Sequence, residues 1–123
     1  MGHVRRFMDL VAWQRAMELC RATYQVCAGL PDTERFGISL QLRRAAVSVP
    51  SNIAEGFGRE SRQDLIRFFR IARGSLYEVQ TLFQLCVDLG FVQDATIPWE
   101  LAAETDRVLQ GLIRSLLAKQ DSG

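Results

Sequence analysis

A proline stands in the middle of an amphipathic helical pattern in residues 41–59, QLRRAAVSVPSNIAEGFGR. Apolar residues recur every three or four positions on both sides of it, which is the spacing of one helix face: Ile38, Leu42, Ala45, Val49 and Ile53. A proline inside a helix removes one hydrogen bond and clashes with the carbonyl four residues back, at a cost of about 3 kcal/mol. Because the pattern keeps its phase across Pro50, the sequence predicts one kinked helix with compensating packing.

The first helix is expected over residues 10–28, with Asp9 as its N-cap and Gly29 and Pro31 as stop signals. Its apolar residues recur at helical spacing and predict one side that faces the core. The predicted core residues are Leu10, Trp13, Met17, Cys20, Tyr24 and Cys27.

The second helix, which contains the proline, is expected to begin at Thr33 or Gly37 and to end at Glu55 before two glycines. A capping-box pattern at residues 61–64 predicts the start of a long third helix, which ends at Gly90. The predicted core stripe of that helix is Leu65, Phe68, Phe69, Ala72, Leu76, Val79, Phe83 and Cys86.

The fourth helix is expected to begin near Thr96 or Pro98 and to fray at Asp121. Its predicted core residues are Leu101, Thr105, Val108, Leu112 and Leu116. Short connections between antiparallel helices favour an all-α, up-down four-helix bundle that occupies the whole 123-residue chain as one domain. Residues 1–8 and 119–123 are expected to be flexible.

Apolar residues also recur on the predicted outer faces, where a simple bundle is polar. They form heptad-spaced rows on the first two helices and flank the core stripe of the third: Ala12, Leu19, Val26, Leu40, Val47, Ala54, Ile66 and Ile71. Contiguous exposed apolar patches mark interfaces, so the rows predict a homo-oligomer. The alternative is a monomer with scattered surface apolar residues, or an error in the helix phases.

The chain offers little for catalysis, because its only histidine is His3 and no base is available for a Ser-His or Cys-His pair. Cys20, Cys27 and Cys86 lack paired zinc-ligand spacing, so no metal or cofactor is expected. The sequence contains no membrane-length apolar run and no secretory signal. We therefore expect a non-enzymatic, cytoplasmic protein that does not enter a membrane.

One polar flank lies beside the apolar stripe of the second helix, at spacings that make its members neighbours. It consists of Gln41, Arg44, Ser48, Asn52 and Glu55. The favoured interpretation is structural: Ser48 and Asn52 satisfy backbone groups disturbed by the proline, and Arg44 and Glu55 pair across helices. The alternative interpretation is a polar groove for a small ligand.

Positive charge is concentrated in residues 35–73, which contain eight arginines and three acidic residues although the net charge of the chain is +1. Five of these arginines lie just before or on the third helix: Arg59, Arg62, Arg67, Arg70 and Arg73. Guanidinium groups suit phosphate, so this row is the candidate nucleic-acid surface. The alternative is an ordinary solvated helix face.

The segment 41–59, together with 34–37, 68–78 and Trp13-Gln14 in the first helix, resembles a known family. These are the four-helix bundle proteins encoded in intervening sequences of bacterial large-subunit ribosomal RNA genes. They are similar in fold to the accessory variability protein of diversity-generating retroelements, which associates with a reverse transcriptase and nucleic acid. The resemblance implies a ring-like homopentamer and no enzymatic activity.

Residues and resemblance together predict a self-assembling bundle that acts as an adaptor for RNA or DNA, or for a nucleic-acid enzyme. The alternative is a scaffold that binds only protein, with the arginine row as ordinary surface. A steep loss of affinity with salt distinguishes the first from the second. A small-molecule site would have to lie on the polar flank of the second helix.

Overall fold

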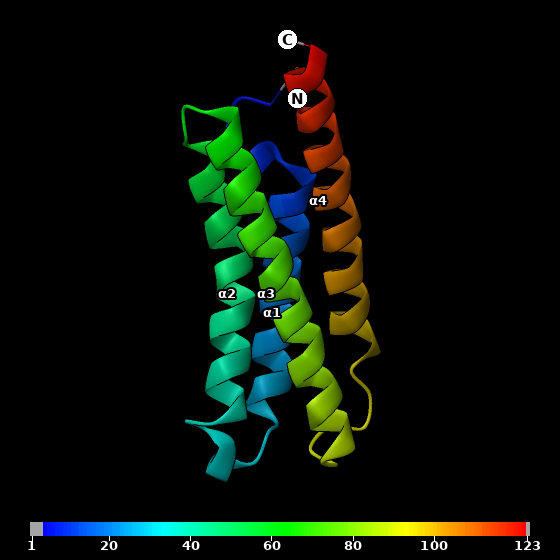
Figure 1. Ribbon diagram of the computed structural model, residues 1–123. Coiled ribbons are helices and arrows are strands. Elements are labelled where there is room, and N and C mark those ends of the chain that lie inside the picture. The colour runs from blue at the N-terminus through cyan, green and yellow to red at the C-terminus, as the bar shows by residue number, and fades with distance from the viewer. Residues whose placement is uncertain (1–3, 123) are drawn as a thin grey trace.

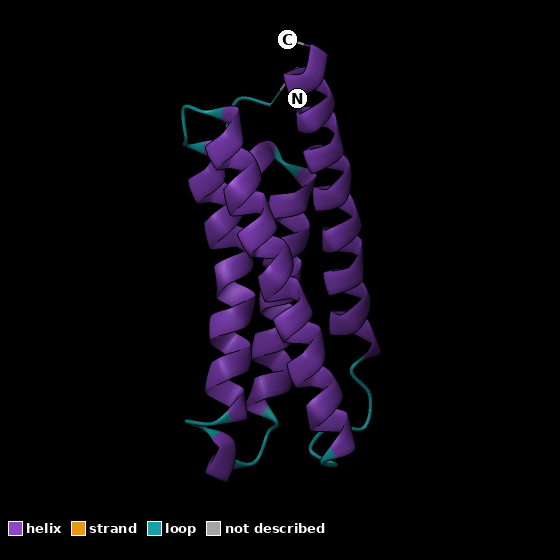
Figure 2. Cartoon of the chain, in the orientation of Figure 1, coloured by secondary structure: helices purple, strands orange, loops and turns teal. Residues whose placement is uncertain are grey.

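The structure, a computed structural model, describes residues 4–122 and consists of four long helices packed side by side (Figures 1 and 2). The helices are α1 (Val11–Ala28), α2 (Ile38–Phe57), α3 (Arg62–Asp88) and α4 (Thr96–Ser122). The single-turn 3-10 helices η1 (Phe7–Asp9) and η2 (Asp32–Glu34) precede α1 and α2. Within the described residues there is no strand, and the predicted all-α four-helix bundle is confirmed.

Each helix packs against two others, so that the order around the bundle is α1, α2, α3, α4 and back to α1. The α1–α2 face is therefore opposite the α3–α4 face. Figure 1 shows that the connection between α2 and α3 lies at the same end as the start of α1 and the end of α4. We call this end of the molecule the α2–α3 end.

Local signals account for some helix ends and not for others. Ser61 caps α3 as predicted, because its hydroxyl accepts a hydrogen bond from the backbone N–H of Asp64 at 3.0 Å. Gly90, which follows α3, has the left-handed φ of 76° that glycine adopts most readily. The prediction that Asp9 caps α1 is wrong. Its carboxylate instead accepts from the backbone N–H groups of Arg5 and Arg6, and Leu10 occupies the N-cap of α1 without a side-chain bond.

Regular structure extends into both terminal segments that the sequence predicts to be flexible. η1 includes residues of the first segment, and α4 continues as a helix through Ser122 rather than fraying at Asp121. Residues 1–3 and 123 lie outside the described part of the chain.

The predicted core stripes of α2 and α3 are confirmed, since every residue named for them is buried. The predicted face of α1 is only partly right: Leu10 and Cys20 are buried, but Tyr24 is exposed and the other three, Trp13, Met17 and Cys27, are half-buried. The face of α1 that is buried consists of Ala12, Ala16, Leu19, Cys20 and Thr23. Apolar residues occur on both sides of α1, so their spacing alone did not determine which side faces inward.

The fourth helix also differs in part from its prediction. Thr105 and Leu116 are buried as expected, whereas Leu101, Val108 and Leu112 are half-buried. The helix buries residues of a neighbouring line instead: Ala102, Asp106, Leu109 and Ile113. Ala102 is small and Asp106 is polar, so hydrophobicity alone did not identify this line of residues as the buried one.

The helix α2 is continuous through Pro50, as the preserved phase predicts. Pro50 has no N–H, so the carbonyl of Ala46, four residues earlier, loses its helical hydrogen bond. The thiol of Cys20 on α1 lies 3.1 Å from this carbonyl oxygen and donates to it. Burial raises the pKa of Cys20 to about 11, which keeps the thiol protonated at neutral pH.

Two more side chains bind backbone carbonyls around the proline. The Asn52 side chain donates to the carbonyl of Ser48 at 2.7 Å. The Ser48 hydroxyl lies 2.7 Å from the Ala45 carbonyl oxygen and 2.6 Å from the Ser75 hydroxyl on α3. Ser48 and Asn52 therefore contact backbone carbonyls of α2, and Ser48 also joins α2 to α3.

A close approach of α2 and α3 depends on Gly56, which is inside α2 because the helix continues past the predicted end at Glu55. A Cβ atom at this position would lie 2.8 Å from the Cβ atom of Phe68. No side chain larger than hydrogen fits without moving α3.

We expect Cys20 and Pro50 to be energetically coupled. Cys20→Ala should lower the free energy of unfolding by about 2 kcal/mol, because it leaves a buried carbonyl unpaired. In a Pro50→Ala background the new alanine supplies an N–H to the same carbonyl, so the cost of Cys20→Ala should fall by about 1 kcal/mol. Urea unfolding of the four proteins measures this coupling. Equal costs in the two backgrounds would show that the thiol does not replace the missing bond.

Candidate functional site

The polar flank of α2 does not form one ligand groove. Glu55 pairs with Arg59 at 3.6 Å, one turn along the same chain, so the prediction that Glu55 pairs across helices is wrong. Gln41 and Arg44 are both exposed, and Arg44 borders an apolar hollow. Of the five flank residues, Ser48 and Asn52 are engaged in the hydrogen bonds beside Pro50.

Arg73 is separated from the other arginines by a polar network between α3 and α4. Its Nε atom lies 2.6 Å from the carboxylate of Asp106, which is buried, and its Nη2 atom donates to the Tyr77 hydroxyl at 2.8 Å. The same carboxylate accepts from Tyr77 at 3.1 Å and from Gln110 at 2.7 Å. The hydrogen bond to Asp106 raises the pKa of Arg73. Arg73 therefore joins two helices, and we no longer include it in the candidate phosphate surface.

Arg59 and Arg67 both lie against the ring of Phe68. Their guanidinium carbons are 4.7 Å and 4.6 Å from the ring centroid. Each also has an acidic neighbour at 3.6 Å, Glu55 for Arg59 and Asp64 for Arg67. These ion pairs are exposed and weak, so they leave both arginines accessible to another anion. The aromatic contact limits the freedom of the two side chains before any ligand arrives.

A shallow hollow beside these arginines lies between α3 and α4. Its volume is about 550 Å³, and its lining is Gln63, Ile66, Arg67, Arg70, Ile71 and Leu117. Ile66 is buried at its floor, whereas Arg70 and Ile71 are exposed. We call it the basic hollow. Together with Arg59 and the exposed Arg62, it brings four arginines to the α2–α3 end, where the carboxylates of Glu55, Glu60 and Asp64 also lie.

Two further hollows are largely apolar and lie on opposite faces of the bundle. The hollow on the α1–α2 face, of about 380 Å³, is lined by Tyr24, Leu40, Arg43, Arg44, Val47 and Ser48. The hollow on the α3–α4 face, of about 490 Å³, is lined by Tyr77, Gln80, Thr81, Gln84, Leu85, Asp88 and Trp99. Arginines border the first of them and an aspartate borders the second, so the two hollows carry opposite charge.

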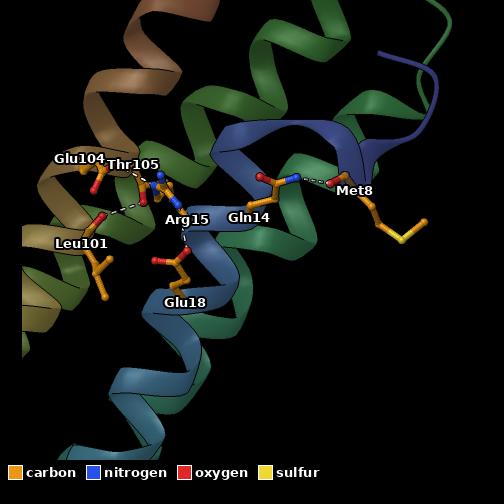
Figure 3. Close-up of polar contacts among 7 residues, drawn as sticks. All are labelled: Met8, Gln14, Arg15, Glu18, Leu101, Glu104 and Thr105. Atoms are coloured by element: carbon orange, nitrogen blue, oxygen red, sulfur yellow. Dashed lines mark hydrogen bonds and ion pairs between the residues drawn. The ribbon is translucent and has the colours of Figure 1, made fainter. Parts of the chain in front are cut away.

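The face between α1 and α4 is closed by polar contacts (Figure 3). Arg15 on α1 lies between Glu18, at 2.9 Å, and Glu104 on α4, at 2.7 Å. The hydrogen bond to Glu104 raises the pKa of Arg15. Thr105 donates to the carbonyl of Leu101 at 2.7 Å, which satisfies its hydroxyl inside the bundle. These residues hold the helices together and form no hollow of their own.

The predicted oligomer interface is only partly available at the surface. Ala12, Leu19 and Ile66 are buried in the core of the chain itself, so their assignment to an outer face is wrong. Val26, Leu40 and Ala54 are half-buried, and Val47 and Ile71 are exposed. The exposed apolar residues Tyr77, Leu85 and Trp99, which line the α3–α4 face, were not among the predicted interface residues, although the sequence places Tyr77 and Trp99 off the core lines of their helices.

The described residues contain no group of His, Cys, Asp and Glu side chains that could hold a metal ion. The three cysteines are free. No helix in the described range is long and apolar enough to cross a membrane. The remaining candidate functional features are the exposed arginines and the surface hollows.

The fold and these surfaces define a four-helix bundle of antiparallel helices with a basic end and two apolar faces. The chain belongs to the family described as 23S rRNA-intervening sequence protein, whose model matches residues 8–114. The resemblance seen in the sequence is confirmed.

A solved structure supports the same fold. It is a protein of unknown function from the S23 ribosomal protein family of Bacteroides thetaiotaomicron, 20% identical, with a TM-score of 0.78. The match covers 85% of this chain and 96% of that one. No curated protein matches the sequence.

We expect Asp106 to be a structural residue. Asp106→Ala leaves Arg73 half-buried and unpaired, and should lower the free energy of unfolding by about 3 kcal/mol. The matched change is Glu104→Ala, which removes a carboxylate from the more exposed pair with Arg15 and should cost less than about 1 kcal/mol. Urea unfolding at neutral pH compares them. Equal and small losses would mean that Arg73 is free to bind a ligand.

Proposed function

We propose that the protein is a non-enzymatic, self-associating adaptor that binds RNA or DNA through the arginines at its α2–α3 end. The residues proposed to contact phosphate are Arg59, Arg62, Arg67 and Arg70. The observation that supports this most is the position of Arg59 and Arg67 against Phe68, which holds two guanidinium groups at the surface. Binding of this kind contacts the backbone and has little sequence preference.

Self-association is the second part of the proposal. The apolar hollows on the α1–α2 and α3–α4 faces lie on opposite sides of the bundle and differ in charge. A face that fits a different face of the next copy makes a head-to-tail contact, which closes into a ring at a suitable angle. The resemblance to ring-forming relatives points to a pentamer. A ring repeats each arginine set, so weak phosphate contacts add together.

The absence of enzymatic activity is also part of the proposal. The only histidine of the chain is His3, and Ser48 and Asn52 of α2 are engaged in structural bonds. Free cysteines suit the reducing cytoplasm, where we place the protein. A nucleic-acid enzyme is a suitable protein partner for such an adaptor.

The second candidate function is a scaffold that binds only protein. The two apolar hollows favour it, and so does the net charge of +1, which gives little long-range attraction for nucleic acid. On that hypothesis the arginines at the α2–α3 end are ordinary surface residues. Nucleic-acid binding at low salt separates the two functions.

We expect the double variant Arg67→Gln/Arg70→Gln to bind RNA and DNA more weakly than the unchanged protein. Loss of two phosphate contacts should reduce the slope of log K against log salt by about 1.5 to 2. The matched control is Arg21→Gln/Arg107→Gln, which removes two exposed arginines from α1 and α4 and should keep the original slope. Fluorescence anisotropy across a salt series measures both. Equal slopes for the two variants would exclude Arg67 and Arg70, and no binding by the unchanged protein would favour the scaffold.

We expect the protein to sediment as an oligomer and Val47→Asp to sediment as a monomer of 13.9 kDa. Val47 is 42% exposed in the single chain, so the new charge disrupts an intersubunit contact and spares the fold. Val11→Asp is the control, because Val11 is 50% exposed and lies outside both apolar hollows. Sedimentation velocity and circular dichroism provide the measurements. A monomeric unchanged protein would refute self-association.

A further inference from the structure

The basic hollow combines two kinds of surface that a simple phosphate site does not need. Its lining joins the polar side chains of Arg67, Arg70 and Gln63 to three aliphatic ones, Ile66, Ile71 and Leu117, of which Ile71 is exposed and Leu117 half-buried. Phosphate contacts alone would use the polar part of the lining and leave the aliphatic part in water. A ligand that covers both the polar and the aliphatic part of the lining must carry an anionic group next to a flat or compact apolar group.

We infer that the basic hollow accepts an unpaired nucleobase, so that the nucleic acid bound at the α2–α3 end is single-stranded. This inference rests on the proposed function and names its ligand. An unpaired base packs one face on Ile66, Ile71 and Leu117 while the neighbouring phosphates reach the guanidinium groups. The Gln63 amide, which has both donors and an acceptor, lies at the edge where a base presents its polar groups.

The size of the hollow agrees with this occupant. Its volume of about 550 Å³ falls within the roughly 300–1,000 Å³ typical of small-ligand sites. The bases of a duplex are stacked on one another, so a duplex presents its backbone and base edges but not the flat face of a base. Single strands expose their bases, and proteins commonly bind them with a basic groove beside a packing surface.

The surrounding charges favour an anion at this position. The nearby carboxylate of Asp106 is neutralised by Arg73, at 2.6 Å, and does not repel phosphate. Asp64 lies 3.6 Å from Arg67 and competes for it, but this pair is exposed and screened by water. Among the described residues Arg70 has no ion-pair partner, so its guanidinium is available to the ligand.

The test compares Ile71→Ser with Leu89→Ser. Ile71 is 42% exposed and lines the basic hollow, whereas Leu89, the C-cap residue of α3, is 54% exposed and lines neither the basic hollow nor the two apolar hollows. The probes are a fluorescein-labelled oligouridine of about 12 nucleotides, within the range one small domain covers, and an RNA duplex of the same length. Anisotropy titrations at low salt measure both affinities, and circular dichroism and sedimentation velocity check fold and assembly.

We expect the unchanged protein to bind oligouridine more tightly than the duplex. Ile71→Ser should weaken oligouridine binding about tenfold, because it removes apolar surface that the base would cover, and leave duplex binding unchanged, while Leu89→Ser should bind oligouridine as before. Equal affinity for both probes with no effect of Ile71→Ser would overturn the single-strand inference and leave the proposed function standing. Binding of neither probe would overturn both.

Two other outcomes would assign the hollow to a different occupant. Dissociation of an oligomer by Ile71→Ser would make the hollow an interface with a second copy. Equal competition by a polyglutamate peptide would make it a site for acidic protein segments. Each of these results overturns the inference.

Discussion

The bond from the Cys20 thiol to the Ala46 carbonyl is the contact on which the arrangement of the helices depends. Pro50 creates the need for it, because it removes the only N–H that could serve that carbonyl within α2. The Cys20 thiol can donate to this carbonyl only when Cys20 faces α2. With α1 in that orientation, Ala12, Ala16 and Leu19 are also buried. The rotation of α1 that supplies this donor is therefore the same rotation that buries its small residues. The resulting small-residue face lets α1 approach closely.

A second constraint divides the α3–α4 face. The Arg73–Asp106 pair, with Tyr77 and Gln110 around it, lies along these helices between the basic hollow and the hollow that contains Trp99. Buried ion pairs add little stability but tolerate few alternative arrangements. The pair therefore separates two surfaces of different chemistry on one face. One surface suits an anion and the other suits an apolar partner.

Local patterns predicted the parts of the fold that depend on neighbours in the chain. The stripes of α2 and α3 each offered one dominant apolar face, and the Ser61 cap involves residues three apart, so these predictions are confirmed. The direction of α1 depends on a contact with Ala46, 26 residues away, and the loss of Arg73 from the candidate site depends on Asp106 in another helix. Spacing within one helix contains no information about such partners. The two apolar hollows likewise arise only when separate helices meet.

The close contact between Gly56 and Phe68 links backbone packing to surface charge. Phe68 supports the guanidinium groups of both Arg59 and Arg67, and its own position depends on the hydrogen atom that serves as the side chain of residue 56. An alanine there would displace the aromatic ring and, with it, two positive charges. Replacing Gly56 by alanine adds no charge, yet it would in this way change the electrostatic potential around the α2–α3 end.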